Sequence, residues 1–245
     1  MCGIVGIAFD SKDRQVEPAL LEQMNQKLLQ RGPDDEGYYF SAGVGLAMRR
    51  LAIIDVAGGK QPMIGPSKKI AAVCNGEIYN FKELREELLK RGHTFYTNAD
   101  SEVIPHLYEE YGERFAEKLC GMFAVAVWDE RRHRLILARD RMGQKPLYWT
   151  QAKGQLIFAS ELKALLVHPE VTPSLDRVSL AKYLAYEYVP APRSIVANIH
   201  KLEAGHFLTL EDGKVRIRQY WNLPTEGEST GISEPLAIEG LKTLF

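Results

Sequence analysis

The chain begins with a cysteine that could act as a nucleophile. Cys2 stands directly behind the initiator Met1 and before an apolar run, residues 3–9, that is predicted to be a buried strand. If Met1 is removed, the thiol and a free α-amino group belong to one residue. An α-amine with a pKa near ~7.7–8.0 can accept the thiol proton at neutral pH. On this residue alone, an accidental cysteine at position 2 is the open alternative.

Three other segments place polar groups beside apolar runs. Arg50 precedes the apolar residues 51–54, and its guanidinium suits either a small carboxylate or a structural ion pair. Asn75 and Gly76 read most simply as a hairpin turn, but a side-chain amide next to a close backbone N–H also suits an oxyanion. Asp100 is either a helix N-cap or an acidic partner for an ammonium group.

Together these residues match the parts of a free amino acid amide. Such a substrate has a carboxylate for the guanidinium, an ammonium for the acidic group and a carboxamide for the thiol to attack. The two adjacent donors would stabilise the oxyanion of that attack. Glutamine fits this inventory, although order in the sequence does not establish that the residues meet in space.

Short strands and a few helices must position these residues. Asp212 and Gly213 predict a two-residue hairpin between 206–210 and 215–221, and Asn80 is expected to cap the helix that follows it. This mixture indicates an α+β sandwich with packed sheets and outer helices. The other strands are expected at residues 3–9, 37–40, 45–54, 70–74, 123–128, 134–139, 147–149 and 156–159. Helices are expected at residues 19–30, 81–91, 102–111, 113–119, 162–166 and 180–186.

The composition excludes several classes of protein. The 245 residues carry a net charge of −1, which argues against nucleic-acid or membrane-surface partners. No apolar run approaches the ~18 residues of a membrane span. Three cysteines suit a reducing cytoplasm, and Cys74 and Cys120 are predicted to be buried structural thiols. The scattered histidines predict no metal site, and His106, four residues after Glu102, is expected to form a surface pair with it.

The motifs resemble the N-terminal glutaminase domain of asparagine synthetase, a class II glutamine amidotransferase with an N-terminal nucleophile (Ntn) fold. The resemblance covers about four fifths of the chain in order. It is carried by Met1-Cys2-Gly3-Ile4, Arg31-Gly32-Pro33-Asp34, Arg50-Leu51-Ala52-Ile53-Ile54-Asp55, Gln61-Pro62-Met63, Asn75-Gly76-Glu77-Ile78-Tyr79-Asn80, Asp100-Ser101-Glu102, and the segments 121–124, 138–148 and 159–163.

This resemblance implies a four-layer αββα sandwich and a set of ten site residues. The roles it implies are nucleophile for Cys2, carboxylate clamp for Arg50, oxyanion hole for Asn75 and Gly76, ammonium ligands for Glu77 and Asp100, and pocket lining for Leu51, Ala52, Ile53 and Ile54. The implied reaction is hydrolysis of L-glutamine to glutamate and ammonia through a thioester on Cys2. In the family, ammonia then passes to a synthetase domain that amidates aspartate.

The resemblance also implies the domain organisation. An amidotransferase domain is expected at 1–223, with a core at about 1–170 and a trailing hairpin segment at 171–223. Residues 224–245 have the composition of a linker and of the start of the synthetase domain. ATP and Mg²⁺ belong to that domain in the family, and its Ser-Gly-Gly-x-Asp-Ser phosphate loop is absent here, so this chain is expected to hold no cofactor.

Two other functions stay open at this point. The chain could be a non-catalytic module that binds glutamine or docks a partner, with residues 139–148 as its docking surface; the simpler reading of that segment is a hairpin in the second sheet. It could also be a glutaminase half that serves a different acceptor. The expected partners are L-glutamine and the synthetase domain, and a homodimer is a further open option.

Overall fold

The strand that follows Cys2 lies inside a six-stranded antiparallel sheet. The computed structural model describes residues 2–223 and 231–244, and residues 224–230 of the expected linker lie outside them. The spatial order of this first sheet is β10 (His200–Lys201), β8 (Tyr148–Ala152), β9 (Gln155–Ala159), β1 (Gly3–Phe9), β3 (Val44–Arg50) and β2 (Asp35–Ser41). Strand β1 is therefore paired on both sides, with β3 and with β9.

A second antiparallel sheet carries Asn75 and Gly76. Its order is β12 (Lys214–Gln219), β11 (His206–Glu211), β7 (Arg134–Arg139), β6 (Gly121–Asp129), β5 (Ile70–Ile78) and β4 (Met63–Ile64). The predicted hairpin at Asp212 and Gly213 joins β11 to β12, and both of its residues have the positive φ that a type I′ turn requires. The two-residue strands β4 and β10 were not predicted.

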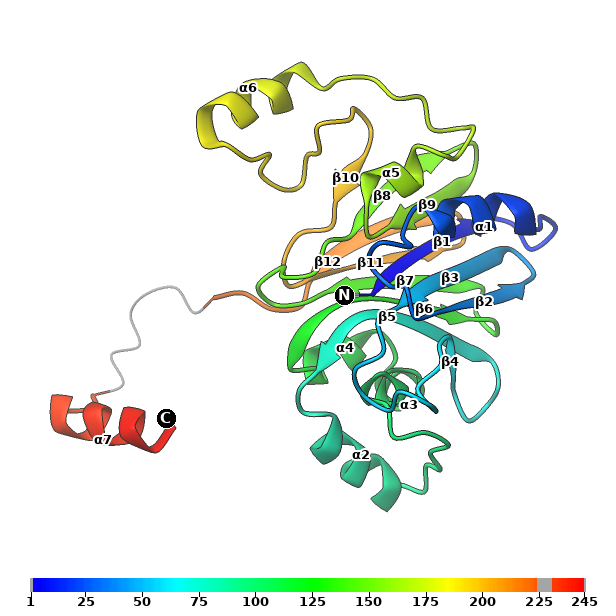
Figure 1. Cartoon of the computed structure of the whole chain (residues 1–245). Coiled ribbons are helices and arrows are strands. Elements are labelled where there is room, and N and C mark those ends of the chain that lie inside the picture. Colours follow the sequence, from blue (N-terminus) through cyan, green and yellow to red (C-terminus); the bar gives the residue numbers. More distant parts are fainter. Residues whose placement is uncertain (1, 224–230, 245) are drawn as a thin grey trace.

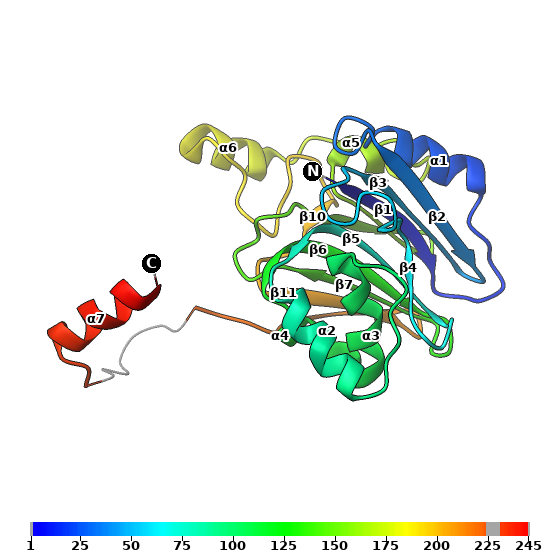
Figure 2. The same cartoon turned by 60° about the horizontal axis from the view of Figure 1, so that its bottom comes forward.

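Helices cover the outer face of each sheet, so that the fold has four layers (Figures 1 and 2). Helices α1 (Pro18–Gln26) and α5 (Leu162–Leu165) pack on the first sheet. Helices α2 (Phe81–Lys90), α3 (Val103–Tyr111) and α4 (Phe115–Lys118), with the short 3₁₀ helices η1 (Asp100–Glu102) and η2 (Gly112–Arg114), lie on the second. The predicted αββα sandwich is confirmed by the structure.

The alternation of side chains along the strands decides which residues face the space between the sheets. In β1, Ile4 and Ala8 join the core between the sheets, and Val5 and Ile7 pack under α1. Cys2 is two residues before Ile4 and packs against the same inner core.

The same alternation applies to β5 in the opposite sheet. Ala71 and Val73 belong to the inner core, while Ala72 and Cys74 face the helices. Asn75 has the parity of Ala71 and Val73, so it lies on the inner face. Because side chains alternate along each strand, Cys2 and Asn75 both point into the space between the two sheets, one from each sheet.

Several predicted boundaries are wrong, and each has a physical reason. The strand expected at 45–54 ends at Arg50, because the chain then enters a loop in which the Arg50 guanidinium binds the carbonyls of Ile54, Asp55 and Val56. Strand β5 continues beyond Cys74 to Ile78, so Asn75 and Gly76 lie within a strand and do not form a turn. Segment 139–148 leads from β7 in the second sheet to β8 in the first, so it is not a hairpin within one sheet.

Two helix termini also differ from expectation. Asn80 precedes α2 without capping it, because its side chain donates to the carbonyl of Lys118 and accepts from the N–H of Cys120. Helix α6 (Arg177–Tyr186) starts earlier than predicted, since the Asp176 carboxylate accepts the N–H of Ser179 and caps it. The apolar pattern predicted from 236 onward lies in helix α7 (Glu234–Leu244).

Candidate active site

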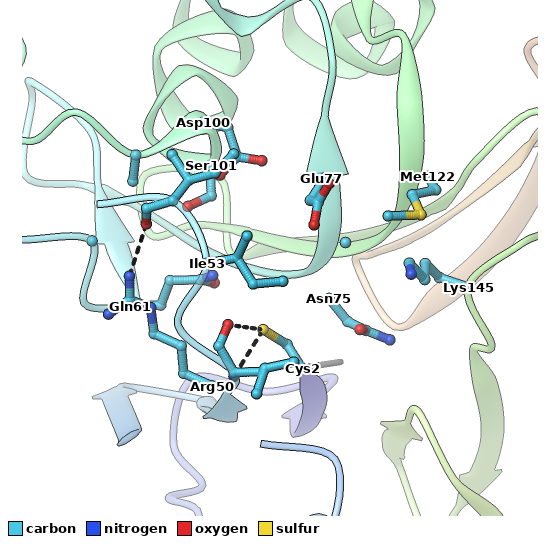
Figure 3. Close-up of a pocket in the computed structure, with 15 residues that line it drawn as sticks. Cys2, Arg50, Ile53, Gln61, Asn75, Glu77, Asp100, Ser101, Met122 and Lys145 are labelled. Atoms are coloured by element: carbon cyan, nitrogen blue, oxygen red, sulfur yellow. Dashed lines mark hydrogen bonds between the residues drawn. The ribbon is translucent and has the colours of Figure 1, made fainter. Parts of the chain in front are cut away.

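A pocket opens where the end of β3 and the middle of β5 approach the start of β1 (Figure 3). Nine of the ten predicted site residues line it, and Ala52 does not. The backbone N–H of Ala52 instead donates to the Asp34 carboxylate, 2.9 Å away. The lining residues are Cys2, Arg50, Leu51, Ile53, Ile54, Gly59, Gln61, Asn75, Gly76, Glu77, Ala99, Asp100, Ser101, Met122 and Lys145.

The thiol of Cys2 is held against the backbone of Leu51. The Leu51 N–H donates to Sγ at 3.4 Å, and the thiol can donate back to the Leu51 carbonyl at 3.7 Å. The Cys2 carbonyl accepts from Nε of Arg31 at 2.8 Å, which anchors the start of the chain from a second direction. Burial raises the pKa of the thiol, and the Leu51 N–H and the Arg50 charge only partly oppose this.

Arg50 is 5% exposed and organises the loop after β3. One terminal nitrogen donates to the carbonyl of Val56, and the other donates to those of Ile54 and Asp55. Within the described residues Arg50 forms no salt bridge, so the structural ion pair is not its role. The guanidinium satisfies three loop carbonyls and still lines the pocket, where a carboxylate could approach its remaining N–H groups.

Asn75 and Gly76 bring an amide and a backbone N–H to the pocket wall. Asn75 is fully buried, and its Nδ2 donates to the Ser160 hydroxyl at 3.3 Å. Gly76 has a φ of 154°, and an added Cβ there would lie 1.9 Å from the carbonyl oxygen of Met122. Only glycine fits so close to strand β6, and this close packing places its backbone beside the pocket.

Asp100 stands on the opposite side of the pocket from Cys2 (Figure 3). Its carboxylate accepts the Ile78 N–H at 2.8 Å, and η1 shows no side-chain cap, so the capping alternative is wrong. Burial raises the pKa of Asp100, and the nearby Glu77 carboxylate acts in the same direction. Two acidic groups in one partly apolar pocket favour a cation between them.

Six lining residues were not among the predicted site residues: Gly59, Gln61, Ala99, Ser101, Met122 and Lys145. Gln61 has a clear structural task, because its Oε1 accepts the Cys74 N–H at 2.6 Å and its Nε2 donates to the Cys74 carbonyl at 3.2 Å. It thereby replaces a strand partner for β5 just before Asn75. The family motif Gln61-Pro62-Met63 singled out Gln61 in the sequence, but nothing in the local sequence indicated its contact with Cys74.

Two expectations about other polar residues are wrong. Glu102 and His106 are 0% and 1% exposed, so their contact is buried and not a surface pair. Cys74 is buried as predicted, but Cys120 is exposed, because it lies in the turn between α4 and β6. Over residues 2–223 and 231–244, the structure brings together no cluster of three or more His, Cys, Asp or Glu side chains suited to a metal.

Comparisons with known proteins show the family to which the chain belongs. A family model described as "Glutamine amidotransferase domain" matches residues 1–221. Asparagine synthetase [glutamine-hydrolyzing] 1 of Bacillus subtilis is 41% identical over 224 residues, covering 90% of this chain and 35% of the relative. Asparagine synthetase [glutamine-hydrolyzing] 3 of Arabidopsis thaliana is 44% identical over 67% of this chain and 28% of the relative. The chain thus spans about a third of the length of these curated relatives.

Solved structures share the fold at low sequence identity. The structure of the allosteric regulatory enzyme of purine biosynthesis matches with a TM-score of 0.66 and 19% identity, over 90% of this chain and 49% of that one. Glutamine phosphoribosylpyrophosphate amidotransferase of B. subtilis matches with a TM-score of 0.65 and 18% identity, with the same coverage of both chains. In the part of the chain that the structure describes, no helix is long and apolar enough to cross a membrane.

Proposed function

Since the chain belongs to the glutamine amidotransferase domain family, we propose that its pocket hydrolyses L-glutamine to glutamate and ammonia through a thioester on Cys2. The observation that carries this proposal is the convergence of Cys2, Asn75 and Gly76 on one pocket from two different sheets. The same pocket holds a cationic group, Arg50, and an acidic group, Asp100, which suit the two charged ends of a free amino acid.

The first half of the reaction forms the thioester. After removal of Met1, the α-amine of Cys2 takes the thiol proton, and Sγ attacks the carboxamide carbon of glutamine. The developing oxyanion accepts hydrogen bonds from Nδ2 of Asn75 and the N–H of Gly76. The carbon–nitrogen bond then breaks, and the α-ammonium returns its proton to the leaving nitrogen, which departs as ammonia.

The second half releases glutamate. The α-amine, neutral again, takes a proton from water as the water oxygen attacks the thioester carbonyl. The same two donors stabilise the second oxyanion, the carbon–sulfur bond breaks, and the proton returns to sulfur. The net reaction consumes one water and leaves the Cys2 thiol as it began.

Substrate recognition follows from the pocket walls. The glutamine carboxylate is assigned to Arg50, its ammonium to Asp100 and Glu77, and its methylene groups to Leu51, Ile53 and Ile54. No contact with the substrate is assigned to Ala52, because this residue does not line the pocket. We expect the chain to discriminate against glutamine derivatives whose α-amine is acylated, since these lack the positive charge.

The experiment is chemical labelling with a glutamine analogue that carries an electrophilic carbon in place of the carboxamide. A Cys120→Ser background removes the exposed thiol that would react unspecifically. We expect one adduct per chain, mapped to Cys2, and loss of glutaminase activity in proportion. Cys2→Ala should release no ammonia and still bind glutamine. An adduct elsewhere, or full activity in Cys2→Ala, would overturn the proposal.

The use of the ammonia is a separate part of the proposal. Because the curated relatives are glutamine-hydrolysing asparagine synthetases, we assign this chain to a cytoplasmic enzyme whose ATP- and Mg²⁺-dependent domain amidates aspartate. The test is to supply the chain with the remaining part of the Bacillus subtilis relative, ATP, Mg²⁺, aspartate and glutamine labelled with ¹⁵N in its amide. Labelled asparagine is expected. Labelled free ammonia alone would contradict the assignment of aspartate as acceptor.

A further inference from the structure

Ser160 connects the nucleophile strand to the opposite sheet. It follows β9 directly and is fully buried. Its backbone N–H donates to the Ile4 carbonyl at 2.9 Å, and its Oγ accepts the Ile4 N–H at 3.0 Å. Ser160 therefore holds β1 two residues from Cys2 with both its backbone and its side chain.

The same hydroxyl reaches Asn75 across the interlayer space. Nδ2 of Asn75 lies 3.3 Å from Oγ of Ser160, while Oδ1 of Asn75 is buried and has no hydrogen-bond partner among the described residues. An unpaired buried acceptor is costly, at about 1–3 kcal/mol. This unpaired acceptor, Oδ1, belongs to the Asn75 side chain, which lines the pocket and from which the proposed reaction needs a hydrogen-bond donor.

The hydroxyl can resolve this conflict. A serine hydroxyl has one hydrogen to donate and two lone pairs. The Ile4 N–H uses one lone pair of the Ser160 hydroxyl, and across the described part of the chain the hydroxyl hydrogen has no acceptor. A half-turn of the Asn75 amide exchanges Nδ2 and Oδ1. The Ser160 hydroxyl then donates to Oδ1, and both N–H groups of Nδ2 turn away from Ser160.

We propose that Ser160 is a positioning residue for catalysis, which donates its hydroxyl hydrogen to Oδ1 of Asn75 and so orients the Nδ2 donor towards the glutamine oxyanion. This inference rests on the proposed glutaminase function and adds a residue to it. Because Ser160 also binds Ile4, a single hydroxyl couples the strand of the nucleophile to the oxyanion donor on the facing sheet.

The first test compares Ser160→Ala with a matched control, Ser179→Ala. Ser179 is equally buried, and its hydroxyl has no partner among the residues described, but it lies on α6 outside the pocket. We expect kcat of Ser160→Ala to fall on the order of tenfold to a hundredfold, because the oxyanion donor is misaligned. KM for glutamine should stay within about twofold, and Ser179→Ala should keep both constants.

A double mutant separates positioning from general support of the fold. If Ser160 acts through Asn75, then adding Ser160→Ala to Asn75→Ala should lower kcat by less than about twofold. Multiplicative losses would overturn the proposal, as would a kcat of Ser160→Ala equal to that of the unsubstituted chain. If the alanine variant does not fold, Ser160→Cys is measured in the same cycle, because a thiol is a weaker donor that fills the same position with a somewhat larger atom.

The reactivity of Cys2 provides the last control. Alkylation of Cys2 by iodoacetamide needs the thiolate but no oxyanion hole, so its rate in Ser160→Ala should stay within about twofold. A large change would mean that Ser160 acts on Cys2 through Ile4, which contradicts the route through Asn75. Failure of the glutaminase proposal itself would be recognised separately, because either the unsubstituted chain would release no ammonia or Cys2→Ala would release it as well.

Discussion

The sulfur of Cys2 lies 3.4 Å from the backbone nitrogen of Leu51, whose N–H points at it. This contact favours the thiolate, but burial disfavours it more, and the net effect is that the pKa of Cys2 is raised. The thiol is therefore largely protonated at neutral pH. A nucleophile in that state needs a base beside it, and the α-amine exposed by removal of Met1 is the nearest in the covalent structure.

In the chain that retains Met1, the raised pKa of the Cys2 thiol predicts how its alkylation rate depends on pH. Only the thiolate reacts, so the rate at Cys2 should still be rising with pH where an ordinary thiol, near ~8.5, has reached half of its maximum. Exposed Cys120 serves as the internal comparison, and peptide mass spectrometry follows both residues in one sample. If the alkylation rate of Cys2 has already reached its maximum at about pH 6 and stays constant up to about pH 8, the prediction is contradicted.

The elements that carry the site could be predicted, because strands such as β1 and β6 show clear apolar runs. The parity of β5 was also available, although its extension past Cys74 was hidden by the Asn75-Gly76 pair, which locally favours a turn. Tertiary pairing decided otherwise, since β5 keeps its register with β6 up to Ile78.

The parts that escaped prediction depend on long-range contacts. Residues 51–54 look like a continuing strand, but Arg50 turns back onto the carbonyls of Ile54, Asp55 and Val56 and ends the strand. Gln61 takes its place beside Cys74, 13 residues away, which no local pattern records. Family resemblance supplied nine lining residues, whereas physical patterns alone supplied single candidates with open alternatives.

Asp100→Asn separates binding from stability. Loss of the negative charge should raise KM for glutamine on the order of tenfold or more, because a charged hydrogen bond to the ammonium is lost. Folding stability at neutral pH should increase, because the raised pKa of Asp100 means that the fold disfavours its charged form. Steady-state kinetics and urea unfolding measure the two effects, and a less stable variant would contradict the second.

The sign of the pH dependence follows from the same shift. A carboxyl group with a raised pKa in the folded state binds its proton more tightly there than in the unfolded chain, so stability falls as pH rises through this window. The stability gain of Asp100→Asn should therefore vanish below the unfolded value of about 3.9. For the unsubstituted chain, KM should begin to rise on acidification at a higher pH than an ordinary aspartate would give.

Glu102→Gln should destabilise the segment that leads to Asp100. The buried carboxylate of Glu102 accepts from the N–H groups of Tyr96 and Thr97 and from the Thr97 hydroxyl, and it lies 3.7 Å from Nε2 of His106. Removing its charge should cost on the order of 3 kcal/mol in the free energy of unfolding. Urea unfolding measures this loss.

The stability contribution of Glu102 depends on pH with the opposite sign to that of Asp100. Burial raises the pKa of Glu102, but the nearby His106 ring and the hydrogen bonds from Tyr96 and Thr97 outweigh it, and the net pKa is lowered. Its contribution is present above the unfolded value of about 4.3 and is lost as pH falls through the folded value. Glu86→Gln, at an exposed position on α2, is the control and should change stability little at any pH.

Gly76→Ala tests the close approach of β5 to β6. An alanine Cβ would lie 1.9 Å from the Met122 carbonyl oxygen and would adopt a φ of 154°. The two strands must separate to accept it, which should cost about 1–3 kcal/mol or more of folding stability. Because the N–H of Gly76 is a proposed oxyanion donor, kcat should fall on the order of 10²–10³-fold with a smaller change in KM.

Gly92→Ala separates backbone strain from steric clash in this experiment. Gly92 also has a positive φ, 91°, but an added Cβ there meets nothing within 4 Å. It should therefore lose stability through backbone strain alone and keep its kcat. If Gly76→Ala were no less stable than Gly92→Ala and equally active, then the tight packing against Met122 would not be what holds the Gly76 donor in place.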